Sequence, residues 1–244
     1  MGRYRGGCPT AKRGCWDAIM REEAREVDRI VRRIESGQAR PQGSGRLDPL
    51  VALRSETKAY HDALEEELSP LVEGISPGAY VSLLRRLLGF YKPLEARIVA
   101  VERLRAVLPD LEGRRKAHLL FADLLHLGMD EADLPCLPVC QYVPRVATVE
   151  EALGCLYVLE GATLGGQIIT RHLKEDLGLD ESGGCAFFYS YGEEVGPMWK
   201  SFRSILHSQC PYPEIQGPLV ASARSTFVSL RRWLATMDES EVCA

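Results

Sequence analysis

One apolar stretch, residues 156–177, constrains this chain most, because it combines helical periodicity with three interior glycines: LYVLEGATLGGQIITRHLKEDL. Each interior glycine costs a helix about 1 kcal/mol relative to alanine. Gly161 and Gly165 are four residues apart, so they form a smooth strip on one helix face, with Gly166 beside it. Without a Cβ, this strip permits close approach of a second helix or of a flat ligand. From the spacing alone, a helix–helix contact or a kink is slightly favoured.

Length and composition indicate one domain, alone or with an extension. The chain has 244 residues, 45% of them hydrophobic, which is enough for a sizeable core. The net charge of -4 argues against a nucleic-acid partner. There is no apolar run of about 18 residues and no apolar signal region, so we expect neither a membrane span nor secretion. The eight scattered cysteines lack a CxxC pair and favour reduced thiols in the cytoplasm.

The first 46 residues differ in character from the remainder. Residues 16–34 have the pattern of a charged amphipathic helix, and the following ESGQARPQGSGR has the composition of a linker. We therefore divide the chain into an extension (1–46), a helical domain (47–238) and a short tail (239–244). The extension is either a partner-binding arm or, as we prefer, a loosely packed peripheral segment.

The domain itself has an almost wholly helical pattern, bounded by caps and prolines. Asp48 and Ser76, each followed by proline, predict two helix starts. The first helix should end before Pro70, and the second should kink at Pro93 and run to about Val107. Further helices are expected over 112–127, 148–177, 193–208 and 220–237, with a long loop over 128–148.

The glycine-bearing helix has the clearest boundaries of the series. Thr148 and Glu151 have the spacing of a capping box, and Gly178 is the expected stop. The prolines at 211, 213 and 218 are expected to break the chain before the last helix. Since no segment alternates convincingly as a strand would, we predict an all-α domain of six or more helices.

His61 is the histidine best placed for chemistry. It lies on the inner stripe of its helix, with Glu65 four residues later on the same face. A carboxylate can orient one ring nitrogen while the other binds a metal, although a half-buried histidine beside an incidental acid is the commoner case. Arg54, two turns earlier, lies about 10 Å away along the same face. A histidine, an aligned cation and a glycine-smoothed helix suit a flat, anionic, iron-bearing ligand such as heme (haem).

Three segments together resemble the heme oxygenase family: LRSETKAYHDALE (53–65), LEGATLGGQII (159–169) and ARSTF (223–227). The form LYVLEGATLGG, followed by FFYSYGEEVGPMW, is most similar to the bacterial branch that supplies biliverdin to bacteriophytochromes. The resemblance extends from about 47 to 234. It implies a single-domain helical bundle in which heme lies between a proximal and a distal helix.

The resemblance also implies roles for individual residues. His61 matches the proximal iron ligand and Glu65 its hydrogen-bonding partner, while Arg54 and Arg203 match positions that pair with the heme propionates. Lys200, one turn before Arg203, can assist; without the resemblance, both would be assigned to a solvated face.

On the distal side, the resemblance implies that Gly161 and Gly165, with Gly166 beside them, let the helix backbone lie over the iron. Phe227 matches an aromatic residue near the heme. Tyr157 is offset by one position from a tyrosine of the family pattern that contacts a propionate.

Position 162 departs from the family pattern. The best-known members carry an aspartate there, which orders the water that protonates iron-bound dioxygen; this chain has Ala162. Glu160 cannot replace it, because each step along a helix turns the side chain by about 100°, and Glu160 is two steps from position 162. We expect water held by distal backbone groups to suffice.

The implied activity is cleavage of heme, with O2 and a reductant, to biliverdin, carbon monoxide and ferrous iron. The chain has no flavin or nicotinamide fingerprint, so a small ferredoxin or flavodoxin-type donor is expected, with a bacteriophytochrome as a possible biliverdin recipient. The first alternative is a heme-binding or heme-trafficking protein without turnover. The second is a cofactor-free helical enzyme or interaction module, such as the thiamine-degrading relatives of this fold.

Overall fold

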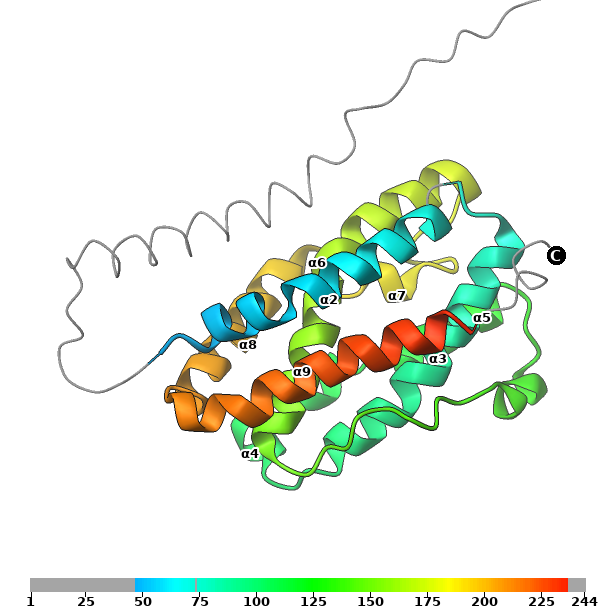
Figure 1. Cartoon of the computed structure of the whole chain (residues 1–244). Coiled ribbons are helices and arrows are strands. Elements are labelled where there is room, and N and C mark those ends of the chain that lie inside the picture. Colours follow the sequence, from blue (N-terminus) through cyan, green and yellow to red (C-terminus); the bar gives the residue numbers. More distant parts are fainter. Residues whose placement is uncertain (1–46, 73, 237–244) are drawn as a thin grey trace, which may run out of the picture. The chain divides into compact units, whose positions relative to one another are not determined.

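The computed structural model describes residues 47–72 and 74–236 (Figure 1). Within these ranges the chain forms helices, turns and isolated bridges but no β-strand, which confirms the predicted all-α class. The elements, in chain order, are α2 (Pro49–Val72), α3 (Pro77–Val99), α4 (Leu104–Val107), η2 (Leu111–Arg114), α5 (Ala117–His126), η3 (Glu131–Cys136), α6 (Val149–Leu177), α7 (Ala186–Tyr189), η4 (Gly192–Glu194), α8 (Val195–Gln209) and α9 (Pro213–Leu234). The helix predicted at 16–34, its linker and the tail at 239–244 lie outside the described residues.

The helix that carries His61 and the helix that carries the glycines share two neighbours. In Figure 1, α2 (blue to cyan) and α9 (orange to red) run side by side. Helix α9 also packs against α6, and α8 packs against both α2 and α6. The relative placement of α2 and α6 is therefore fixed largely through α8 and α9.

Helix α6 begins and ends where the sequence predicts. Thr148 Oγ1 accepts a hydrogen bond from the Glu151 amide at 3.2 Å, and Glu151 Oε2 accepts one from the Thr148 amide at 3.2 Å, so the capping box is confirmed. Gly178 ends the helix with φ +69°. By length and composition α6 could cross a membrane, but 61% of its most apolar window is buried, as in the core helix of a globular domain.

The two predicted helix starts before prolines are also confirmed. Asp48 Oδ1 accepts a hydrogen bond from the Leu50 amide at 2.9 Å, and Ser76 Oγ accepts one from the Ala79 amide at 3.2 Å. The prolines at 49 and 77 then occupy first-turn positions, where a missing N–H removes no helical hydrogen bond.

Several predicted breaks at prolines are wrong. Helix α2 continues through Pro70 to Val72, and α9 begins at Pro213 rather than at Val220, with Pro218 inside it. Pro213 is again a first-turn proline, and the turn after Pro218 is held by packing, since Leu219 is fully buried. Conversely, α3 contains Pro93 but ends at Val99, not at 107.

The expected helix over 112–127 is divided into η2 and α5 by a contact from another helix. Glu95 of α3 places Oε1 2.5 Å from the amide of Lys116 and 3.1 Å from that of Ala117, so its carboxylate caps the start of α5. In the same way Asp123 of α5 accepts hydrogen bonds, both 2.8 Å, from Ala186 and Phe187 at the start of α7. Helix α7 was not predicted, because its cap lies far away in the sequence.

Candidate active site

His61 lies on α2 with its side chain 26% exposed. Its Nδ1 atom is 3.4 Å from Glu65 Oε2, so the carboxylate faces Nδ1 and directs Nε2 away from itself. The Phe227 ring of α9 packs edge-on against the imidazole, with centroids 5.9 Å apart and an interplanar angle of 76°. Glu65 and Phe227 thus hold the imidazole from two sides, as a metal-ligating histidine requires.

Asp62 lies near the same imidazole and, with His61 and Glu65, forms a group of possible metal ligands. Its Oδ1 lies 4.0 Å from His61 Nδ1, and one ligand atom each of His61, Asp62 and Glu65 fall within 4.8 Å of one another. The three side chains can hold a small metal ion. Asp62 also forms an exposed ion pair with Lys58, so it is already partly neutralised.

The three glycines of the central stretch of α6, Gly161, Gly165 and Gly166, differ in their surroundings. A Cβ added at Gly161 would meet no heavy atom within 4 Å, so the space beside this residue is open. A Cβ at Gly166 would lie 2.3 Å from the carbonyl oxygen of Phe188, so this glycine is required by the close approach of α7. Gly165 is buried between them. Packing within the protein therefore accounts for Gly166 and does not account for Gly161.

Helix α9 joins the two parts of the site. A Cβ at Gly154 of α6 would lie 2.2 Å from the carbonyl oxygen of Leu219, so α6 and α9 are in backbone contact there. Two turns further along α9, Phe227 reaches His61 on α2. A single helix, α9, thus touches both the glycine-bearing helix and the histidine.

The remaining predicted site residues come from α2, α6 and α8. Arg54 and Arg203 are half-buried, and Lys200 is exposed. The half-buried Tyr157 packs its ring against Trp199 of α8, with centroids 5.9 Å apart. Of the predicted set, the ring and carboxylate contacts bring His61, Glu65 and Phe227 directly together; the roles of the cations and of Tyr157 stay predictions.

The side chains on either side of Gly161 face opposite environments. Ala162 is exposed, whereas Glu160 is 1% exposed. The Glu160 carboxylate accepts hydrogen bonds from Arg114 Nη1 at 2.6 Å and from the Tyr191 hydroxyl at 2.8 Å. Burial raises the pKa of the Glu160 carboxyl, although Lys116 and Arg114 oppose that shift. The divergence expected between residues 160 and 162 is confirmed.

Sequence reasoning did not find the partners of Glu160. They come from η2, from the residue before α5 and from the turn before η4, which are remote from one another in the sequence. A pattern of helical periodicity contains no signal for such contacts.

The chain matches the family model described as Heme oxygenase over residues 48–236. It belongs to the heme oxygenase family. A heme oxygenase of Xanthomonas campestris pv. campestris (strain 8004) is 29% identical over 167 residues, which cover 66% of this chain and 92% of that protein.

Two solved structures support the fold of this heme oxygenase family member. The NO- and CO-bound heme oxygenase of Neisseria meningitidis superimposes with a TM-score of 0.63 at 22% identity, covering 80% of this chain and 96% of that one. The heme oxygenase of Leptospira interrogans gives a TM-score of 0.65 at 16% identity, covering 78% and 100%. Family and fold together support heme degradation, with heme as the bound substrate.

Proposed function

We propose that this family member is an O2- and reductant-dependent heme oxygenase that converts heme to biliverdin, carbon monoxide and ferrous iron. The observation that carries the proposal is the His61 imidazole, whose Nδ1 faces Glu65 at 3.4 Å while Phe227 packs on the ring. A histidine oriented in this way presents Nε2 to an iron atom.

The residues present suit heme in two further respects. The open space beside Gly161 lets the backbone of α6 approach a flat ligand, and α9 connects that helix with His61. Heme, when bound, supplies both the iron that activates O2 and the porphyrin that is cleaved. Arg54 and Arg203, with Lys200 assisting and Tyr157 nearby, would pair with the propionates and so fix which edge of the ring is presented.

Ala162 favours one alternative, heme binding without turnover. Its methyl group cannot hold a water molecule or move a proton, and its side chain is exposed rather than enclosed. We expect turnover nevertheless, because water can be held by the backbone groups around Gly161 and Gly165.

Electrons must come from another protein, since the chain has no flavin or nicotinamide fingerprint. We propose a small ferredoxin or flavodoxin-type donor in the cytoplasm. The segments LYVLEGATLGG and FFYSYGEEVGPMW of this chain resemble the bacteriophytochrome-associated branch, and this resemblance supports a bacteriophytochrome as recipient of the biliverdin.

The test is an anaerobic hemin titration followed by air and a reductant, with catalase present so that free peroxide cannot degrade the heme. A one-to-one Soret band that bleaches while a broad red verdin absorption grows is expected. A Soret band that survives would favour heme binding without turnover. If no Soret band forms, a cofactor-free enzyme or interaction module becomes the better assignment.

The ligand assignment is tested by His61→Ala. This variant should lose the histidine-ligated spectrum, and added imidazole should restore it by filling the space that the side chain leaves. His126→Ala, which removes an exposed histidine on α5, is the matched control and should bind heme as the wild type does. An unchanged spectrum in His61→Ala would show that another residue binds the iron.

A further inference from the structure

The proposed function leaves unexplained a group of buried charges next to Gly161. Glu160, Arg114 and Lys116 are 1%, 2% and 3% exposed, respectively. Lys116 Nζ lies 3.9 Å from Glu160 Oε1 and 3.5 Å from the centroid of the Tyr191 ring. Tyr191 also donates its hydroxyl to Glu160. The four side chains form one cluster, called here the Glu160 cluster.

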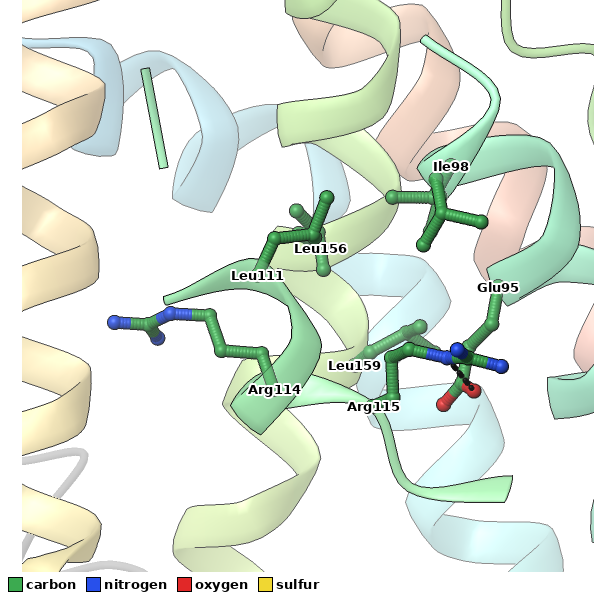
Figure 2. A pocket seen from close by; sticks show the side chains of 8 residues that line it. Glu95, Ile98, Leu111, Arg114, Arg115, Leu156 and Leu159 are labelled. Carbon is green, nitrogen blue, oxygen red and sulfur yellow. Dashed lines mark ion pairs between the residues drawn. The ribbon is translucent and has the colours of Figure 1, made fainter. Parts of the chain in front are cut away.

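Arg114 anchors this cluster from the short helix η2. Its Nη1 binds Glu160, while Nε and Nη2 bind Asp110 at 3.1 and 2.8 Å. Figure 2 shows the next residue, Arg115, pointing the opposite way, toward Glu95 of α3, with Nε 3.5 Å from Oε2. Residues 110–116 are thus tied to α6 on one side and to α3 on the other.

Tyr191 enters the cluster from a tightly constrained turn. Ser190 has φ +54° and ψ -112°, an unfavourable conformation for a residue with a side chain, and Gly192 has φ +56°. Such strain persists only where surrounding contacts enforce it. Burial raises the pKa of the Tyr191 phenol, which keeps its proton available for donation to Glu160.

Buried ion pairs of this kind do not favour stability over well-packed apolar side chains, because the desolvation cost offsets the attraction. They do restrict geometry, since each donor and acceptor must stay within hydrogen-bonding distance of its partner. The restricted element here is the turn of α6 that contains Glu160 and Gly161.

We propose that Glu160 is a positioning residue for the distal side of the heme site. Through Arg114 and Tyr191 it fixes the rotation and height of α6 at Gly161, and hence the distance between the Gly161 backbone and a diatomic molecule on the iron. This inference rests on the proposed function. It concerns Glu160 and not Ala162, because the methyl group of Ala162 has no polar atom that could hold α6 in place.

The experiment uses the heme-loaded, reduced protein with carbon monoxide as the probe, because the C–O stretching frequency responds to the distance and polarity of distal groups. Glu160→Gln keeps the shape of the side chain but places an amide donor among the donors of Arg114 and Tyr191. We expect the C–O band to shift and broaden. Tyr191→Phe removes one hydrogen bond only and should produce a smaller shift.

Glu175→Gln is the matched control, since it makes the same chemical change at an exposed position of α6. Its C–O band should equal that of the wild type. An unchanged band in both Glu160→Gln and Tyr191→Phe, even with a lower melting temperature, would show that the cluster is structural only and would overturn the proposal. If Glu160→Gln does not fold, Tyr191→Phe decides.

Failure of the proposed function gives a different result. In that case the wild type forms no Soret band with hemin, and the positioning role falls with it. A wild type that binds heme but never forms verdin still permits the carbon monoxide measurement, so the role of Glu160 can be judged separately from turnover.

Discussion

Gly161 and Gly166 lie five residues apart on one helix, yet alanine should have opposite effects on stability at the two positions. At Gly161 the new Cβ meets no heavy atom within 4 Å, so Gly161→Ala gains only the helix propensity of alanine, about 0.5–1 kcal/mol. In a domain of this size, 1 kcal/mol raises the melting temperature by about 2–4 °C. The heme-free variant should therefore melt about 1–4 °C above the wild type.

At Gly166 the same change introduces an overlap. The Cβ would lie 2.3 Å from the Phe188 carbonyl oxygen, whereas carbon–oxygen contacts begin at about 3.3 Å. The backbones of α6 and α7 must separate by about 1 Å, and overpacking of this kind costs about 1–3 kcal/mol. After subtraction of the propensity gain, Gly166→Ala should be destabilised by up to about 2.5 kcal/mol.

The assay has two stages, thermal unfolding of the heme-free variants by circular dichroism and then hemin titration. Gly161→Ala should be the more stable protein and the weaker heme binder, because its methyl group occupies the space that the ligand needs. If Gly161→Ala is destabilised as much as Gly166→Ala, the space beside Gly161 is not open. If Gly161→Ala is stabilised but binds hemin unchanged, Gly161 does not face the ligand.

Two further predictions concern buried ionisable groups. Burial raises the pKa of the Cys185 thiol to about 11, so only about one molecule in a thousand carries the thiolate at pH 8. Iodoacetamide should therefore modify the exposed Cys136 much faster than Cys185 in the native protein, as read by peptide mass spectrometry; equal rates would contradict the burial. Burial lowers the pKa of Lys116 from 10.5 to about 8, with Glu160 opposing that shift. The unfolded chain keeps this proton up to pH 10.5 and the native chain loses it near pH 8, so between these values the unfolded state binds more protons and stability rises with pH, by up to about 3 kcal/mol. Lys116→Met should flatten this rise in the free energy of unfolding with pH, as measured by urea unfolding at a series of pH values. An unchanged rise would assign it to other groups.

The sequence predicted those features that depend on residues close together in the chain. Thr148 and Glu151 make their own capping box, and Glu65 lies on the face of His61 because the helix repeat places it there. The predictions failed where a distant residue decides the outcome. Glu95 ends the helix predicted from 112 and starts another at Ala117, and the partners of Glu160 come from other elements.

The glycine stretch shows the same limit within one helix. Spacing alone could not separate a ligand contact from a helix contact, because both need a missing Cβ. The structure assigns Gly166 to the contact with Phe188 and leaves open space beside Gly161. The roles of Arg54, Arg203 and Lys200 stay predictions, since the direction of a long flexible side chain depends on the ligand that it meets.

The carboxylates that cap α5 and α7 have a consequence for the order of folding. An isolated ten-residue helix is marginal in water, and α5 begins on Glu95, so α5 should become stable only after α3 has docked. Helix α7 has four residues and begins on Asp123 of α5, so it must follow α5. Because α7 packs against α6 at Gly166, this support of the glycine helix should form after α5 and open before it, which native-state hydrogen exchange at the amides of Ala186 and Phe187 would detect.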